Sequence, residues 1–247
     1  MRLLLINPNM TESMTHAMTN VARATAGPQV EIIPLTASTG FPYISSRAEA
    51  QIAGADVLDA IASNKAGVDA VIIAAFGDPG LTAARELFDL PIVGMAEAAT
   101  LSAAMLGERF SVVTFTPYMS RWYTECIRQT GLGARFAGVR CPEVPPETLN
   151  NVATALREDL IDLATKATSL DGADVVILGG APLAGLAPLI AQETPGILVD
   201  PIAAATVQAL ALARLAPCYD NRTNRPAPKA SIGLGSDLAA IFTGEKP

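Results

Sequence analysis

The stretch Val71-Ile72-Ile73-Ala74-Ala75-Phe76, which continues through Gly77-Asp78-Pro79 to Gly80-Leu81, is an apolar β-branched run followed by turn residues and a helical pattern. Such a run predicts a buried strand of a parallel sheet that turns into a helix. The pattern returns at Val176-Ile177-Leu178-Gly179-Gly180-Ala181, which continues to Gly185-Leu186. This repetition indicates that one structural unit occurs twice in the chain.

Two further pairs of segments repeat in the same order and at nearly the same offset. Residues 3–10 parallel residues 112–119, with Pro8 opposite Pro117 and Met10 opposite Met119. Residues 91–94, followed by 98–100, parallel residues 197–200, followed by 204–206. Three matches in one order indicate an ancient duplication.

Each half alternates short β-branched runs with longer helical stretches, which is typical of βαβ units. The expected fold class is therefore α/β, with two flavodoxin-like parallel-sheet subdomains related by a pseudo-twofold axis and a site in the cleft between them. We expect an N-terminal half over residues 1–98, a C-terminal half over 99–206, and a C-terminal helix and tail over 207–247 that packs back on the first half. The expected strands are 3–6, 30–34, 70–74, 92–93, 111–115, 135–138, 175–178 and 198–199. The expected helices are one capped near Thr11 with a core stripe of Met10, Met14 and Met18, then 48–63, 81–87, one from Ala96, 147–167, and one capped by Ser236.

The composition limits the class of partner. Of the 247 residues, 50% are hydrophobic and 17% are charged, and the net charge is −7, which argues against binding to nucleic acid. Glycine and proline interrupt the longest uncharged stretch, residues 175–192, so we expect no membrane segment. One histidine and three scattered cysteines are too few for a structural metal site and suit a reducing cytoplasm. The Ala-rich helices leave faces to cover, which favours a homo-oligomer.

Four loops at strand ends are candidates for ligand binding: residues 7–9, 75–80, 114–118 and 179–182. Each combines small residues with the start of a following helix, whose free N–H groups suit a carboxylate or a ring carbonyl. The expected ligand is a small, polar, anion-like molecule.

The motifs in these loops resemble those of a known family. Ile6-Asn7-Pro8-Asn9, Phe76-Gly77-Asp78-Pro79-Gly80-Leu81, Gly94-Met95-Ala96-Glu97-Ala98 and Val199-Asp200 are similar to the hydantoin racemase branch of the aspartate/glutamate racemase superfamily. The resemblance covers about residues 1 to 215. It implies two pseudo-symmetric subdomains and cofactor-independent proton transfer at a carbon next to a carbonyl. In the family, two cysteines on opposite sides of the cleft move the proton.

The sequence departs from the family at these two cysteines. The aligned positions hold Ala75 and Gly180, which cannot carry a proton, and Cys126, Cys141 and Cys218 lie outside the aligned loops. The two-thiol mechanism therefore cannot be transferred to this chain.

Three side chains are candidates to replace the thiols, and each has a plainer alternative. Asp78 is a possible base or the cap of the helix that follows Pro79 and Gly80. Glu97 is a possible acid with a raised pKa, or a first-turn residue favoured by the helix dipole. Tyr43 is a possible phenolic donor over the cleft or a surface-loop aromatic. Arg47 could pair with a carboxylate or be a solvated arginine.

The expected binding residues come from the same loops. Asn7 and Asn9 also suit an Asx turn that ends the first strand, which is compatible with binding. The resemblance suggests that Thr114 and Thr116 hold a carboxylate or ring oxygen. The remaining expected contacts are Ala75, Phe76, Gly77, Tyr118, Gly180 and Ala181.

The resemblance favours a hydantoin racemase-like isomerase that acts on a small cyclic ureide or an amino-acid-derived acid, without a cofactor and without the cysteine pair. Two alternatives remain open. One is a hydrolase or lyase on the same scaffold, and the other is a non-catalytic protein that binds a small molecule.

Overall fold

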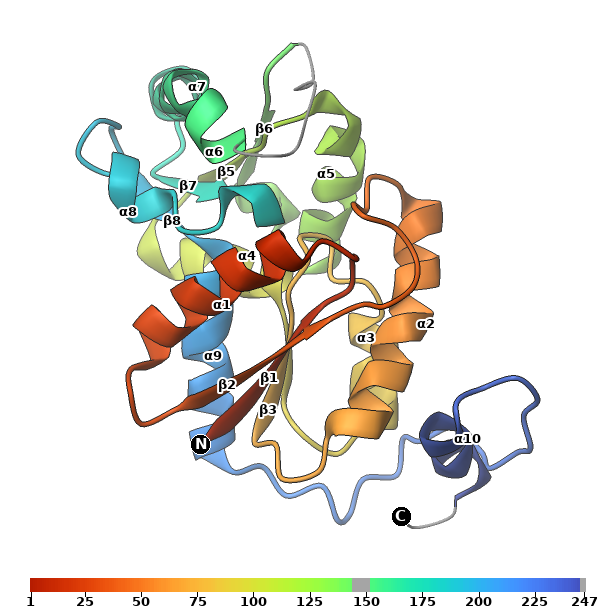
Figure 1. Ribbon diagram of the computed structural model, residues 1–247. Helices are drawn as coiled ribbons and strands as arrows, with labels where there is room; N and C mark the ends of the chain where they lie inside the picture. Colours follow the sequence, from red (N-terminus) through yellow and green to blue (C-terminus); the bar gives the residue numbers. More distant parts are fainter. Residues whose placement is uncertain (144–151, 245–247) are drawn as a thin grey trace.

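The computed structural model describes residues 1–143 and 152–244 as two lobes, each built on a four-stranded parallel sheet (Figure 1). The first sheet has the order β2-β1-β3-β4 and the second has the order β6-β5-β7-β8. The orders are identical once each strand is paired with its repeat, so the predicted duplication and fold class are confirmed. The strands are β1 (Arg2–Asn7), β2 (Glu31–Thr36), β3 (Ala70–Ile73), β4 (Ile92–Gly94), β5 (Phe110–Val113), β6 (Phe136–Arg140), β7 (Val175–Leu178) and β8 (Ile197–Val199).

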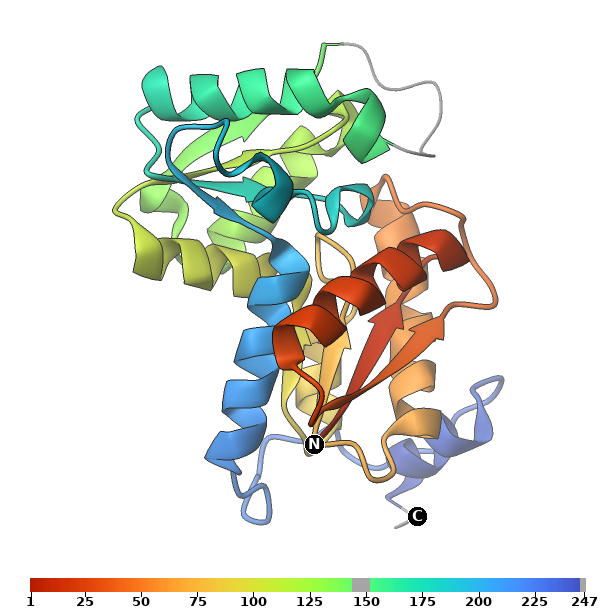
Figure 2. The ribbon, with the colours of Figure 1, turned by 60° about the vertical axis from the view of Figure 1, so that its left-hand side comes forward.

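The helices join the two lobes as well as covering their sheets. They are α1 (Glu12–Ala26), α2 (Arg47–Asn64), α3 (Leu81–Leu87), α4 (Met95–Leu106), α5 (Ser120–Gln129), α6 (Val152–Ala155), α7 (Arg157–Ser169), α8 (Ala187–Ile190), α9 (Pro201–Leu215) and α10 (Ser236–Thr243). Helix α9 leaves the second sheet but packs on α1 and β3 of the first, while α4 leaves the first sheet and contacts β7 and β8 of the second (Figure 2). The lobes are therefore tied together by an exchange of helices.

Successive side chains of a strand point to opposite faces of the sheet, and this alternation determines which core cluster each side chain joins. Leu3 and Leu5 of β1 face a central cluster that continues into the second lobe, whereas Leu4 and Ile6 face a separate cluster under α2 and α3. All four side chains are almost completely buried, and each such burial stabilises the fold by roughly 1.5–3 kcal/mol. Because one cluster includes side chains of both sheets, the relative position of the lobes is part of the core packing.

Several helix ends differ from the sequence predictions. Thr11 precedes α1, but its side chain does not cap the helix and instead donates to the carbonyl oxygen of Pro42 at 2.6 Å. Ser236 is the first residue of α10 and makes no capping bond. Met10 is exposed, so the buried stripe of α1 begins at Met14. Of the predicted helix 147–167, residues 147–151 lie outside the described residues, and the rest is divided at Leu156 into α6 and α7.

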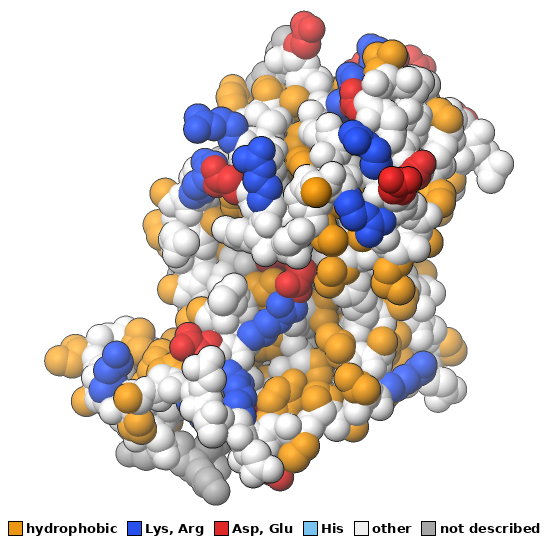
Figure 3. Space-filling model, turned by 180° about the vertical axis from the view of Figure 1, so that it is seen from behind, with side chains coloured by type: hydrophobic (Ala, Val, Ile, Leu, Met, Phe, Trp, Pro, Cys, Tyr) orange, Lys and Arg blue, Asp and Glu red, His pale blue; other side chains and the backbone are white. Residues whose placement is uncertain are grey.

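The segment after α9 returns to the first lobe. Helix α10 packs against α2, and Leu238 is buried in the cluster beneath α2 and α3. Seen from behind, hydrophobic side chains gather on the side that carries α4 and α9 (Figure 3). Met105 of α4 is 86% exposed. The expected self-association stays a prediction.

No helix in the described part of the chain is long and apolar enough to cross a membrane.

Candidate active site

The carboxyl ends of β1, β3, β5 and β7 meet at a cavity between the two lobes. Its volume is about 20 Å³, which is room for about one water molecule. The lining residues are those that follow the four strands, with additional side chains from the loop before α2 and from α5: Asn9, Tyr43, Ile44, Ala75, Phe76, Phe115, Met119, Trp122, Tyr123, Gly180, Ala181 and Pro182. The cavity therefore includes both positions where the family has its cysteines.

Gly180 is fixed as glycine by its surroundings. Its φ of +126° lies in a region that side-chain-bearing residues rarely adopt, and a Cβ there would lie 2.5 Å from Cε1 of Phe115. The Phe115 ring thus fills the place that a thiol at position 180 would need. On the other side, Ala75 presents only a methyl group to the cavity.

Aromatic rings form most of the cavity wall. Phe115 packs on Tyr43 with ring centroids 5.8 Å apart, and Phe76 packs on Tyr123 at 4.6 Å. None of the described lining residues is charged. Such a lining favours a flat, uncharged ligand over the anion-like molecule expected from the loops, because a buried carboxylate needs a partner that these residues do not supply.

The polar groups at the cavity and beside it are mainly hydroxyls. Those of Tyr43 and Thr116 are buried and have no hydrogen-bond partner within the described residues, whereas the hydroxyl of Thr114 lies against the phenol of Tyr123. Burial and the nearby charge of Glu49 raise the pKa of Tyr43, and burial raises the pKa of Tyr123 well above its ordinary value. Both phenols therefore keep their protons at neutral pH and act as hydrogen-bond donors.

The two asparagines predicted to bind a ligand have different positions. Asn7 is fully buried, and its amide donates to Asn9 Oδ1 and Thr15 Oγ1, both at 3.0 Å, so it organises the turn after β1. Asn9 lines the cavity while its Oδ1 also accepts from the N–H of Thr11 at 2.9 Å. The expected Asx turn is present, and Asn9 alone reaches the cavity.

Asp78 caps a helix, but not the helix expected from the sequence. Its two carboxylate oxygens accept the N–H groups of Ala96 and Glu97, both at 2.8 Å, at the start of α4. Burial raises the pKa of Asp78 to about 7, although these two hydrogen bonds oppose the shift. Asp78 and the adjacent Gly77 line a second pocket rather than the cavity.

Glu97 and Tyr118 line neither the cavity nor the second pocket. Glu97 forms a two-point ion pair with Arg85, in which Nη1 lies 2.9 Å from Oε1. Tyr118 is 70% exposed. The structure thus brings Tyr43 to the cavity but does not bring Asp78 or Glu97 there with it.

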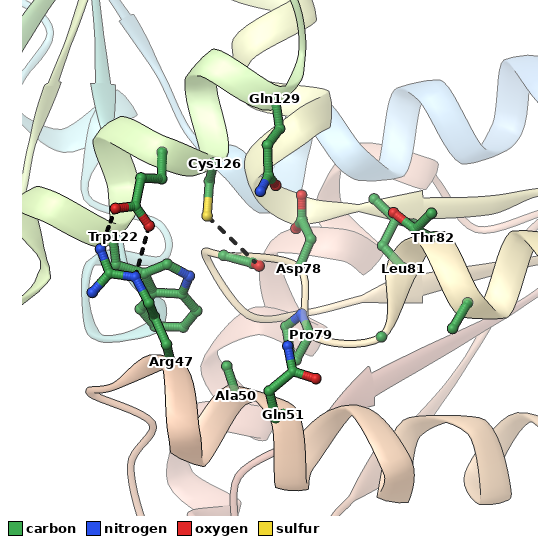
Figure 4. Close-up of a pocket in the computed structure, with 14 residues that line it drawn as sticks. Arg47, Ala50, Gln51, Asp78, Pro79, Leu81, Thr82, Trp122, Cys126 and Gln129 are labelled. Carbon is green, nitrogen blue, oxygen red and sulfur yellow. Dashed lines mark hydrogen bonds and ion pairs between the residues drawn. The ribbon is translucent and has the colours of Figure 1, made fainter.

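The second pocket, called the outer pocket below, has a volume of about 350 Å³ and lies between α2 and α5 (Figure 4). Its lining includes Arg47, Gln51, Asp78, Cys126 and Gln129. Burial, together with the charges of Asp78 and Glu125, raises the pKa of the Cys126 thiol to about 12, so it stays protonated and is a poor nucleophile.

Sequence reasoning included Phe115 in a candidate loop without giving it a role, and it missed Trp122 and Tyr123. The last two lie on α5, which follows Pro117-Tyr118-Met119, the repeat of the Pro8-Asn9-Met10 turn before α1. The repeat could therefore have located α5. The described residues contain no group of three His, Cys, Asp or Glu side chains that could hold a metal.

Comparisons with known proteins agree with this geometry. A family model described as Asp/Glu/Hydantoin racemase matches residues 3–209. Hydantoin racemase from Paenarthrobacter aurescens is 31% identical over 207 residues, which cover 83% of this chain and 88% of that protein. Allantoin racemase from Klebsiella pneumoniae superposes with a TM-score of 0.88 at 32% identity, covering 96% and 98% of the two chains. Allantoin racemase from Pseudomonas fluorescens gives a TM-score of 0.88 at 33% identity, with coverage of 94% and 100%.

Proposed function

The chain belongs to the Asp/Glu/hydantoin racemase family, and from that premise we propose that it is an isomerase that moves a proton on a small cyclic ureide without the cysteine pair. The observation that carries this proposal is the pair of buried hydroxyls of Tyr43, at the uncharged cavity, and Thr116, beside it, neither of which has a partner within the described residues. A buried polar group without a partner costs stability. Hydrogen bonds to the oxygen atoms of a ligand would offset that cost.

The lining distinguishes between the two substrate classes that the sequence left open. An amino-acid-derived acid would bring a carboxylate into a wall made of Tyr43, Phe76, Phe115 and other uncharged residues. Burial of an unpaired carboxylate is strongly unfavourable. A cyclic ureide is planar and uncharged, so its ring can lie against the aromatic side chains while its carbonyl oxygens accept hydrogen bonds. The ureide is the better fit.

The proposed chemistry uses the hydroxyls to stabilise an enolate. When a proton leaves the carbon beside a ring carbonyl, negative charge develops on the carbonyl oxygen, and fixed donors lower the energy of that state. Tyr43 is assigned the role of donor, because its protonated phenol lines the cavity and can hydrogen-bond the carbonyl oxygen on which the charge develops. A water molecule accepts the proton that leaves the carbon, and solvent returns a proton to either face of the enolate, so the exchange balances without a co-reactant.

The test is hydrogen–deuterium exchange in D₂O with allantoin and single enantiomers of 5-substituted hydantoins, followed by NMR and by loss of optical activity. We expect exchange at the carbon beside the carbonyl. We also expect Tyr43→Phe to slow it by about 10²-fold or more, the typical effect of removing one hydrogen-bond donor to a developing oxyanion. Tyr219→Phe is the matched control, because Tyr219 lies outside the cavity. Product formation without exchange would instead indicate a hydrolase or lyase.

A second candidate function is non-catalytic binding of the same ligand. It is favoured by Ala75 and Gly180, which cannot transfer a proton, and by the raised pKa values of Tyr43 and Tyr123. A pure binding protein would show a ligand-dependent rise in melting temperature, because binding stabilises the folded state by mass action. It would show this rise with no exchange for any ureide.

A further inference from the structure

The cavity between the lobes is too small for the proposed ligand, which raises the question of how a ligand is admitted. A volume of about 20 Å³ admits a water molecule but not a five-membered ring. The outer pocket, at about 350 Å³, is large enough for such a ring and lies directly beside the cavity. Trp122 lines both spaces, so its side chain is a wall between them.

Packing contacts hold the Trp122 ring in place. A Cβ on Gly77 would lie 2.8 Å from Cη2 of Trp122, so the indole rests directly on the backbone of the loop after β3. The ring also packs near Tyr123, with ring centroids 6.0 Å apart. A side chain held by packing moves when its neighbours separate, and these neighbours belong to different lobes.

An ion pair joins the lobes at the outer pocket. Arg47 of α2 contacts Glu125 of α5 through two hydrogen bonds, with Nε 2.6 Å from Oε2 and Nη2 2.5 Å from Oε1. Both side chains are about half exposed. An exposed pair contributes at most about 1 kcal/mol, so it can open easily while still biasing the lobes towards the closed arrangement.

The outer pocket also suits an uncharged polar molecule. Arg47 and Glu125 neutralise each other, and the two oxygens of Asp78 are already engaged by the N–H groups at the start of α4. The amide groups of Gln51 and Gln129 are available on opposite walls (Figure 4). Amide groups both donate and accept hydrogen bonds, as the ring of a cyclic ureide does. The pocket and the cavity would thus select the same ligand class.

We propose that the outer pocket is a binding site for the incoming cyclic ureide and that Trp122 is the movable wall through which the ligand passes into the cavity. The ligand class rests on the proposed function, whereas the two-step path rests on the geometry of the two spaces. Separation of α2 from α5, with loss of the Arg47–Glu125 pair, frees the indole to move.

The chain contains a single tryptophan, so its intrinsic fluorescence reports directly on Trp122. The experiment is stopped-flow fluorescence with hydantoin, allantoin and 5-substituted hydantoins on the full chain. We expect a saturable emission change in two phases, the first dependent on ligand concentration and the second not. A ligand that binds without any change in emission would overturn the proposal.

Two variants test the path itself. Arg47→Gln removes the ion pair and is expected to accelerate the second phase about two- to fivefold, the equivalent of up to about 1 kcal/mol. Arg157→Gln is the control, because Arg157 forms a comparable exposed pair with Glu193 away from the pocket. Thr82→Phe, a change at an exposed position on the pocket wall, is expected to slow association about tenfold by filling the pocket.

The outcomes separate this proposal from the proposed function. Deuterium exchange with no change in Trp122 emission, or with rates unaltered in Arg47→Gln and Thr82→Phe, would show that the ligand enters elsewhere while the isomerase assignment stands. A two-phase emission change without exchange would support the entry path and overturn the isomerase assignment.

Discussion

The Phe115 ring occupies the space that a side chain at Gly180 would require, with Cε1 2.5 Å from the position of a Cβ. The two residues follow neighbouring strands, β5 and β7, of the second sheet. The absence of a side chain at position 180 therefore allows the phenylalanine ring at position 115 to pack there. A cysteine could not return to position 180 without a change at Phe115.

We expect Gly180→Ala to destabilise the fold by roughly 2–4 kcal/mol, because steric overlap adds to the strain of a positive φ. Gly138 provides the matched control. Its φ of +139° is similar, but nothing lies within 4 Å of its Cβ position, so Gly138→Ala should cost only about 1–2 kcal/mol. The free energy of unfolding from urea denaturation measures both.

A double-mutant cycle isolates the contact. In a Phe115→Leu background, Gly180→Ala should cost about 1 kcal/mol less than in the native background, because the smaller side chain vacates part of the space. Equal costs in the two backgrounds, or equal costs for Gly180→Ala and Gly138→Ala, would mean that the Phe115 ring does not restrict position 180.

Removal of the buried hydroxyls that have no partner among the described residues should not weaken the fold. Tyr43→Phe and Thr116→Val each remove a buried hydroxyl without a partner, so we expect unfolding free energies unchanged or higher by up to about 1 kcal/mol. Thr15→Val is the contrast, because the Thr15 hydroxyl bonds Thr36 at 2.7 Å and Asn7 at 3.0 Å, and its loss should cost about 1–2 kcal/mol. If Tyr43→Phe were as costly as Thr15→Val, its hydroxyl would be serving the fold and not a ligand.

The duplication explains why the fold was predictable from the sequence. A parallel strand carries its ligand-facing residues at its carboxyl end, so finding the repeat was enough to place Ala75 and Gly180 at one cavity. The absence of a proton carrier at both positions was also evident from the sequence alone. Local patterns of this kind need no knowledge of side-chain packing.

The roles of the acidic residues depended on contacts between distant segments, which no local pattern contains. Asp78 follows β3 and caps α4, whereas Asp200 caps its own helix, α9, and reaches back to the N–H of Gly185 after β7. In each half, an aspartate thus connects the loop after the third strand with the start of the helix after the fourth strand. The aspartate lies in the loop in the first half and at the start of the helix in the second half. The Phe115–Gly180 contact and the pairing of Glu97 with Arg85 are equally non-local, so the sequence left several roles open for each residue.

The variant Glu97→Gln tests whether Glu97 is a catalytic acid. Because its carboxylate pairs with Arg85 and lines neither the cavity nor the outer pocket, we expect Glu97→Gln to leave the deuterium exchange rate within about twofold of the native rate. Its stability should fall by no more than about 1 kcal/mol, since the pair is partly exposed. A loss of exchange of about 10²-fold with the fold intact would restore Glu97 as a proton carrier.

Asp78 should make stability depend on pH in an unusual direction. Burial raises its pKa from an ordinary value of 3.8 to about 7 in the folded chain. Between these values the folded state binds more protons than the unfolded state, so the contribution of Asp78 is fully present below about pH 4 and declines as the pH rises through 7. The side chain in Asp78→Asn cannot ionise and lacks this dependence.

The measurement is the difference in unfolding free energy between the native chain and Asp78→Asn at several pH values. Other titrating groups are common to both proteins and cancel in this difference. We expect the native chain to gain stability relative to the variant as the pH is lowered from about 8 to about 5. A difference that stays constant from pH 8 to pH 5 would mean that the two N–H donors of α4 stabilise the carboxylate at least as much as burial penalises it, and the pKa of Asp78 would then lie at or below 3.8.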